Sequence, residues 1–127
     1  MIDMYRDADG RLLAIVLSHE TGKTGIEFIT PPENALQVAY MHHLRGHEIA
    51  LHEHLPQERT LHTTQEVLLV RSGTIEATLH NGVKFTLLPG DVVVLVAGGH
   101  SFKMLTDCEL YEVKQGPYIA ANDKRWL

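Results

Sequence analysis

The sequence predicts an all-β protein, either a sandwich or a small barrel. Apolar and polar residues alternate with a period of two in many short runs, as they do in half-buried strands. Turn signals recur between these runs at intervals of about 8–12 residues, which gives about eight to ten short strands. No stretch of ordinary helix length shows a helical pattern. The spacing is typical of a sandwich or a closed barrel.

The first half of the chain predicts five strands. A β-rich run follows the turn at Asp7–Gly10 and is expected to pair back across it. Pro31 and Pro32 end the third run, because proline removes a ladder donor. The fourth run could be read as helix or strand, and its period of two favours strand. The expected strands are Met1–Arg6, Arg11–Ser18, Gly25–Thr30, Ala35–Leu44 and His47–His54.

The second half predicts a series of hairpins. Asn81-Gly82 is the strongest hairpin signal in the chain, because both positions of a type I′ turn favour positive φ. Pro89-Gly90-Asp91 marks a second turn, and residues 117–127 are expected to form a short helical or extended tail. A tight loop at Ala97-Gly98-Gly99 leads to His100. The expected strands are Thr64–Ser72, Thr74–His80, Lys84–Leu88, Val92–Val96 and Cys108–Gln115.

The composition is that of one ordinary globular domain. The 127 residues are 44% hydrophobic and 21% charged, with a net charge of −5 when histidines are neutral. No clustered basic face is visible, which argues against nucleic acid as a partner. The single cysteine, Cys108, cannot form an intrachain disulfide, and no apolar run is long enough to span a membrane. We therefore expect a cytoplasmic protein without a membrane partner.

Two histidines and a glutamate predict a metal site. His52 and His54 lie two residues apart on the expected strand 47–54, so their side chains point to the same face. Glu66, on the next expected strand, adds a carboxylate. Imidazole and carboxylate together are a common ligand set for transition metals.

The spacing of these residues resembles the first motif of the cupin superfamily. That motif is matched by Gly46, His52, His54, Glu66 and Gly73, with residues 55–65 as an insertion. The stretch from Pro89-Gly90-Asp91 to His100 resembles the second cupin motif, although Val96 stands where a proline is usual. The run 111–118 is similar to the ending of a group of small single-domain cupins.

The resemblance implies a double-stranded β-helix over residues 1–127. The barrel core would span about residues 35–115, after N-terminal strands in 1–30 and before a tail at 117–127. The implied metal ligands are His52, His54, Glu66 and His100. Such a set suits one divalent ion of Fe, Mn, Ni, Co or Zn and leaves two positions of an octahedral ion open.

Two alternatives to this ligand set stay open. In a second register, His62 and Glu66 have the short spacing usual for the motif, so that His62, Glu66 and His100 would bind the ion. The other alternative is that the histidines are surface residues of a barrel without a metal.

We expect a metal-dependent enzyme that acts on a small, oxygen-rich metabolite, of isomerase, epimerase or dioxygenase type. Glu66, Glu112, Lys114 and Arg59 are the candidate catalytic or substrate-binding side chains. One alternative is a non-catalytic cupin that binds or senses a small molecule. Another is a metal-free epimerase or isomerase that uses a histidine and a carboxylate as acid and base.

Apolar residues on the outer side of the expected barrel predict a homodimer. If His52 and His54 face inward, Ile49 and Leu51 face outward, and Val92–Val96 is apolar on both faces. Such positions are normally covered by another surface, either a second copy of the chain or the N-terminal strands, and we expect a homodimer.

Overall fold

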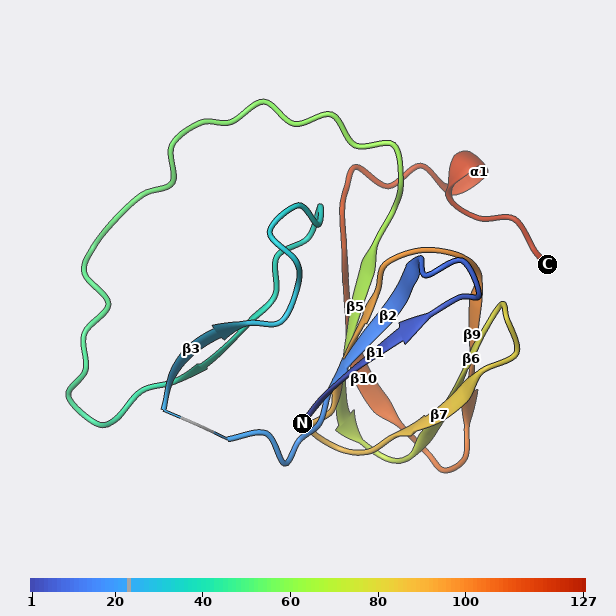
Figure 1. Cartoon of the computed structure of the whole chain (residues 1–127), viewed down its shortest axis with the longest axis horizontal. Helices are drawn as coiled ribbons and strands as arrows, with labels where there is room; N and C mark the ends of the chain where they lie inside the picture. The colour runs from blue at the N-terminus through green and yellow to red at the C-terminus, as the bar shows by residue number, and fades with distance from the viewer. Residues whose placement is uncertain (23) are drawn as a thin grey trace.

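A computed structural model describes residues 1–22 and 24–127, and nearly all of its regular structure is β (Figure 1). The only helix in these residues is the short α1 (Ala120–Asp123), and none of their helices is long and apolar enough to cross a membrane. The strands are β1 (Ile2–Arg6), β2 (Leu12–Leu17), β3 (Gly25–Phe28), β4 (Ala39–His42), β5 (Glu66–Ser72), β6 (Ile75–Leu79), β7 (Lys84–Leu87), β8 (Val92–Leu95), β9 (His100–Met104) and β10 (Glu109–Lys114).

The strands form three antiparallel sheets. A five-stranded sheet has the order β1-β2-β8-β5-β10, and a three-stranded sheet has the order β7-β6-β9. The hairpin of β3 and β4 forms a third sheet by itself and lies beside the five-stranded sheet, on the side away from β9 (Figure 1). The arrangement confirms the all-β class, and the three sheets do not close into one barrel.

The central strands of the five-stranded sheet are buried on both faces. Side chains of a strand alternate between its faces, and on β2 the residues Ala14 and Val16 face one apolar cluster while Ile15 and Leu17 face another. Val93 and Val94 of β8 divide in the same way. This double burial explains why β2 and β8 are continuous apolar runs rather than alternating ones.

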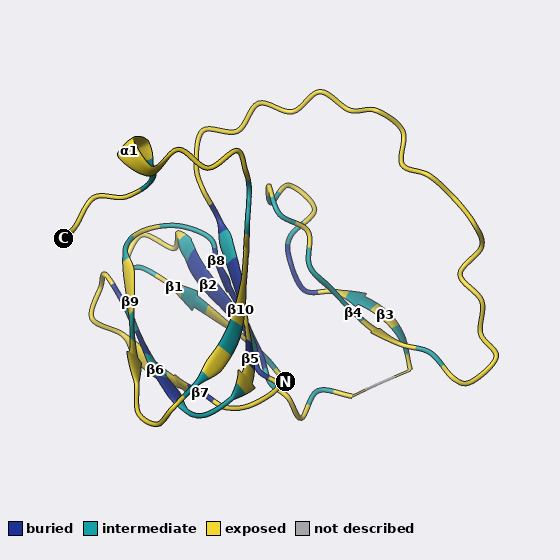
Figure 2. Ribbon diagram, turned by 180° about the vertical axis from the view of Figure 1, so that it is seen from behind, coloured by how far each residue is buried: buried dark blue, intermediate teal, exposed yellow. Residues whose placement is uncertain are grey.

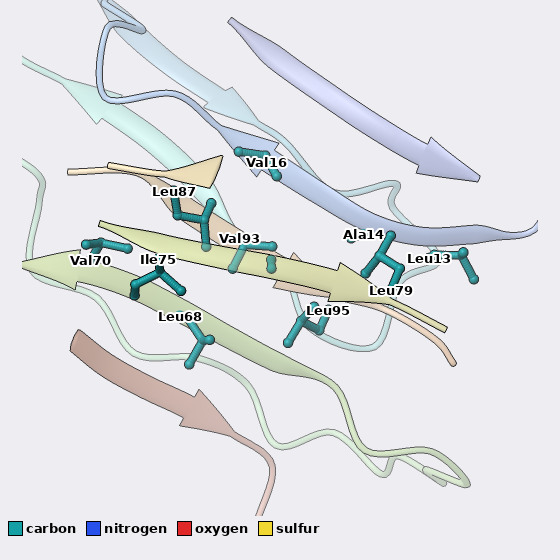
Figure 3. Packing of buried hydrophobic residues seen from close by; sticks show 11 residues of the cluster. Leu13, Ala14, Val16, Leu68, Val70, Ile75, Leu79, Leu87, Val93 and Leu95 are labelled. Atoms are coloured by element: carbon teal, nitrogen blue, oxygen red, sulfur yellow. The ribbon is translucent and has the colours of Figure 1, made fainter. Parts of the chain in front are cut away.

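The main core lies between the five-stranded and three-stranded sheets (Figure 3). Ile75 and Leu87 from the small sheet are fully buried and belong to the same cluster as Leu13 and Val93 from the large sheet. Burying a branched aliphatic side chain stabilises a fold by about 1.5–3 kcal/mol. This cluster therefore holds the two sheets together.

A second, smaller cluster covers the outer face of the large sheet. Ile29 is buried in it, and Leu36 and Val38 from the chain before β4, with Tyr40 of β4, pack on it. Gln65 fixes this cover, because its side chain exchanges hydrogen bonds of 2.8 and 3.0 Å with the Asn34 amide. The chain next to β3 and β4 is thereby attached to the sheet just before Glu66.

Most of the predicted strands are confirmed, but the strand predicted at 47–54 is wrong. Residues 44–64 form one extended, exposed segment without regular structure, which we call the arm (Figure 2). Only Ala39–His42 of the strand expected at 35–44 is in a sheet. The alternation at 47–54 suits a strand, but a strand also needs an edge to supply its ladder of hydrogen bonds. The arm extends away from the open edge of β9 (Figure 1).

Candidate functional site

Four of the candidate side chains meet at one end of the space between the two sheets. Glu66 is opposite Lys114 in the ladder of β5 and β10, and Glu112 is opposite Leu68. Directly opposed residues share a face of a sheet, and Leu68 belongs to the main core. Glu66, Glu112 and Lys114 therefore point inward.

His100 reaches the same place from the small sheet. It is opposite Leu79 in the ladder of β6 and β9, and Leu79 is a core residue, so the imidazole also points inward. Its Nε2 lies 3.8 Å from Glu66 Oε2. This distance is too long for a hydrogen bond. Two metal–ligand bonds of about 2.1 Å each could bridge it.

A pocket of about 100 Å³ opens beside this pair. Liquid water occupies about 30 Å³ per molecule, so the pocket has room for a few waters or for one end of a small metabolite. Its lining includes charged, polar and apolar groups: Arg11, Thr63, Thr64, Glu66, Leu95 and His100. A site of this kind suits a polar ligand much smaller than a nucleotide.

Glu66 has an unusual protonation equilibrium. Burial raises its pKa, and a hydrogen bond with Glu112 and the charge of Glu112 raise it further, to about 7. The cations of Lys114 and Lys124 act in the opposite direction and do not cancel the effect. At neutral pH the Glu66 carboxyl is therefore divided between its acid and base forms, which suits a group that transfers protons.

His100 is held in its neutral form. Burial lowers its pKa, and the positive charge of Lys124 adds to this effect against the opposing influence of Glu112. A neutral imidazole can bind a metal ion or accept a proton. Both possibilities agree with its place beside Glu66.

Lys114 joins the site to the C-terminal tail. Its Nζ lies 3.3 Å from Asp123 Oδ2 and 3.9 Å from Glu112 Oε2, and it stands over the ring of Tyr118. Burial acts to lower its pKa, but the Asp123 hydrogen bond and the carboxylates of Glu112 and Glu66 outweigh burial, so the pKa is raised. Lys114 therefore remains a cation beside Glu112 and opposite Glu66 in the ladder.

The two remaining metal ligands implied by the resemblance are elsewhere. His52 and His54 lie in the exposed arm, where their ring centroids are 5.4 Å apart. Nδ1 of His52 is 2.7 Å from the Ala50 carbonyl oxygen. If Nδ1 donates this bond, Nε2 keeps its lone pair free, which is the state of a metal-binding imidazole.

The expected four-ligand set is therefore not assembled within this single chain. Across residues 1–22 and 24–127, no group of three or more His, Cys, Asp and Glu side chains is arranged so that it could hold a metal ion. Glu66 and His100 fit as half of such a set, while His52 and His54 do not reach them. His62 is also exposed in the arm, shortly before the pocket residue Thr64.

Several site residues were not identified from the sequence. Arg11 precedes β2 and lines the pocket, whereas Arg59, the arginine that was expected near the site, is exposed in the arm. Asp123 and Lys124 reach the cluster from the tail. No sequence signal marks these positions, because only the packing of both chain ends against the sheets brings Arg11 to the pocket and Asp123 and Lys124 to the charged groups beside it.

Comparisons with models of protein families, with curated proteins and with solved structures find no match for the chain.

Proposed function

We propose that the chain is a metal-binding enzyme with a cupin-type double-stranded β-helix, and that it acts on a small, oxygen-rich metabolite. The observation that carries the proposal is the meeting of Glu66, His100, Glu112 and Lys114 from three strands, beside a pocket that Glu66 and His100 line. The cupin-like spacing of Glu66 and His100 supports a shared ion. Isomerisation, epimerisation and oxidation by dioxygen are the reactions that this donor set and pocket can accommodate.

The metal would supply Lewis acidity and open positions for the oxygen atoms of the substrate. Only Glu66 and His100 of the four implied ligands meet within one chain. The roles of the other residues follow from their contacts. Lys114 is a fixed cation suited to an oxyanion or a carboxylate, and Glu112 is a carboxylate within hydrogen-bond reach of Glu66.

Metal analysis of protein purified without chelator and without a polyhistidine tag tests the proposal. We expect close to one equivalent of one transition metal per chain. His52→Ala and His100→Ala should each abolish binding, while His62→Ala should leave it intact. Less than about a tenth of an equivalent, with no rebinding of Co²⁺ or Zn²⁺, would refute metal binding.

A second candidate is a metal-free isomerase or epimerase. It is favoured by the neighbouring carboxyls of Glu66 and Glu112, which share a face of β5 and β10 and of which Glu112 raises the pKa of Glu66. One carboxylate of the pair would take a proton from the carbon next to a carbonyl, and the Lys114 ammonium would stabilise the resulting enolate oxygen. In an epimerisation, a proton would then return to the opposite face of the same carbon. In the isomerisation of a hydroxy-carbonyl compound, it would return to the former carbonyl carbon while the neighbouring hydroxyl proton passes to the enolate oxygen, so that no atom is gained or lost.

Chelation distinguishes the two candidates. The protein would be assayed on panels of sugars, sugar nucleotides and keto acids before and after exhaustive treatment with chelator. Loss of turnover that returns with added metal supports the first candidate, and turnover that persists supports the second. Bound metal without turnover on any panel would favour a non-catalytic binding module.

A further inference from the structure

The chain exposes much more surface than a compact protein of its size. Its accessible surface is 9347 Å² for a mass of 14.3 kDa. A folded monomer of this mass exposes roughly 6,800 Å², so the excess is roughly 2,500 Å² per chain. Permanent dimers bury about 2,000–5,000 Å² over both copies. The excess is therefore as large as the surface that a second copy of the chain would cover.

The excess is concentrated on the arm and on the hairpin next to it (Figure 2). Every residue from 44 to 64 is exposed. The arm is nevertheless not a polar linker, because it carries large apolar side chains: Ile49 is 59% exposed and Leu51 is fully exposed. On the neighbouring hairpin, Phe28 is also 63% exposed. Exposed apolar side chains on an extended segment indicate that another surface covers them.

The small sheet offers an edge that fits the arm. β9 is the last strand of the order β7-β6-β9, so one side of its backbone has no strand partner in the described sheets. Met104 at the end of β9 points toward the core side, opposite the buried Ile75, yet it is 45% exposed. An added strand would pair the open backbone groups and cover this side chain. The alternating residues 47–54 have the pattern of such a strand.

The arm of a second copy fits this edge better than the arm of the same chain. Most of the arm loops out on the side of the molecule away from β9, and only its last residues, Thr63 and Thr64, reach the pocket that His100 lines (Figure 1). A two-fold pair of chains can exchange arms reciprocally, so that each arm covers the open edge of the other copy.

We propose that the protein is an arm-exchanged homodimer in which residues 47–54 of each copy pair with β9 of the other, and that His52 and His54 thereby join Glu66 and His100 of the partner. Histidines two residues apart on the added strand would share one face, next to the inward face of β9 that carries His100. The metal part of this inference rests on the proposed function, whereas the exchange of arms does not.

A cross-linking experiment tests the exchange without any metal. Both copies carry Cys108→Ser, so that no native thiol reacts. One copy also carries Leu51→Cys on the outward face of the arm, and the other carries Ser101→Cys on the outward face of β9. The copies bear different affinity tags and are co-expressed, and a short bismaleimide is added. We expect a covalent product that contains both tags. Placing the first cysteine at Val83 instead, on the far hairpin of the small sheet, is the matched control and should give little product.

Complementation tests the shared site. Two double variants are needed. One loses the histidines of the arm (His52→Ala/His54→Ala), and the other loses the ligands of the sheets (Glu66→Gln/His100→Ala). Each variant alone should form dimers that do not bind Co²⁺. The purified heterodimer should bind one Co²⁺ per dimer, against two for the wild type, because one of its two sites regains all four ligands. If each arm instead folds back on its own chain, the heterodimer binds none.

The outcomes separate the exchange from the proposed function. A monomer at micromolar concentration in sedimentation velocity, or a dimer without the mixed cross-link, overturns the exchange whether or not metal binds. A cross-linked dimer whose wild-type form takes up no metal supports the exchange and refutes the metal-dependent function. A cross-linked dimer that binds metal but shows no complementation refutes the shared site.

Discussion

Glu66 and Lys114 are direct partners in the antiparallel ladder of β5 and β10, so that a largely buried carboxyl and a cation leave the sheet on the same face. The Lys114 ammonium also contacts the carboxylates of Asp123 and Glu112. It lowers the pKa of Glu66, but burial and the neighbouring Glu112 raise this pKa by more. The site therefore keeps a carboxyl that is protonated at pH values where an exposed glutamate is charged.

Glu66→Gln should stabilise the protein at pH 8 and leave it nearly unchanged at pH 5. The folded-state pKa of Glu66 is about 7, above the ordinary 4.5, so the folded state holds this proton more tightly than the unfolded state. Its stabilising contribution is present at low pH and is lost as the pH rises through about 7. The loss between pH 5 and pH 8 is on the order of 2 kcal/mol. Urea unfolding of both proteins at the two pH values measures it.

The exposed Glu109 on β10 provides the control for this prediction. Glu109→Gln should leave the difference in unfolding free energy between pH 5 and pH 8 as it is in the wild type. A Glu66→Gln protein whose stability changes with pH as the wild type does would contradict the raised pKa.

Lys114→Met should raise the pKa of Glu66 further. The lysine cation is one of the two charges that lower this pKa, and methionine keeps a similar length and apolar stem without the charge. Titration of ¹³C-labelled glutamate carboxyls by NMR would follow Glu66 directly. Lys103→Met, an exposed position on β9, should leave the titration unchanged. A Glu66 midpoint that stays constant or falls in the Lys114 variant would contradict the proposed coupling.

The strand pattern and the inward residues could be predicted from the sequence because both depend on local alternation. The alternation that predicts a strand at 64–72 also places Glu66 on the face of Leu68 and Val70, and these three side chains do share a face. Glu112 and Lys114 follow by the same argument on the last strand. Turn residues such as Asn81-Gly82 then fixed where each strand ends.

The rest of the site depends on contacts between distant parts of the chain. Arg11 comes to the pocket and Asp123 to Lys114 from the two ends of the chain, and no local pattern gives their packing. The arm differs for another reason. Residues 47–54 have the alternation of a strand, but alternation does not tell which edge the strand pairs with, nor whether that edge belongs to the same chain.

Asp91→Ala should destabilise the fold by about 3 kcal/mol. The buried carboxylate accepts hydrogen bonds from the backbone N–H groups of Leu88 and His19, at 2.8 and 2.7 Å, and lies 2.8 Å from His19 Nδ1. These contacts close the turn between β7 and β8 and hold it to the end of β2. Hydrogen bonds to a charged acceptor contribute about 1.5–3 kcal/mol each, and the loss leaves backbone donors unpaired.

Equilibrium unfolding of Asp91→Ala and Asp91→Asn tests this role. Asparagine keeps one acceptor oxygen and should cost less than alanine. His19→Ala removes one contact and leaves the two backbone bonds, so it should cost the least of the three. An Asp91→Ala protein within about 0.5 kcal/mol of the wild type would show that solvent replaces the carboxylate at no cost.

Gly73→Ala should be much more destabilising than Gly82→Ala, although both glycines have positive φ, of 86° and 87°. A Cβ at Gly82 meets nothing within 4 Å, so the cost there is the left-handed backbone alone, about 1–2 kcal/mol. A Cβ at Gly73 would lie 2.3 Å from the Asp107 carbonyl oxygen and 2.9 Å from Cys108 Cα. Since both are backbone atoms, the start of β10 must move, at a further cost of about 1–3 kcal/mol. Equal unfolding free energies for the two variants would show that the turn after β5 does not fix the position of β10, the strand that carries Glu112 and Lys114.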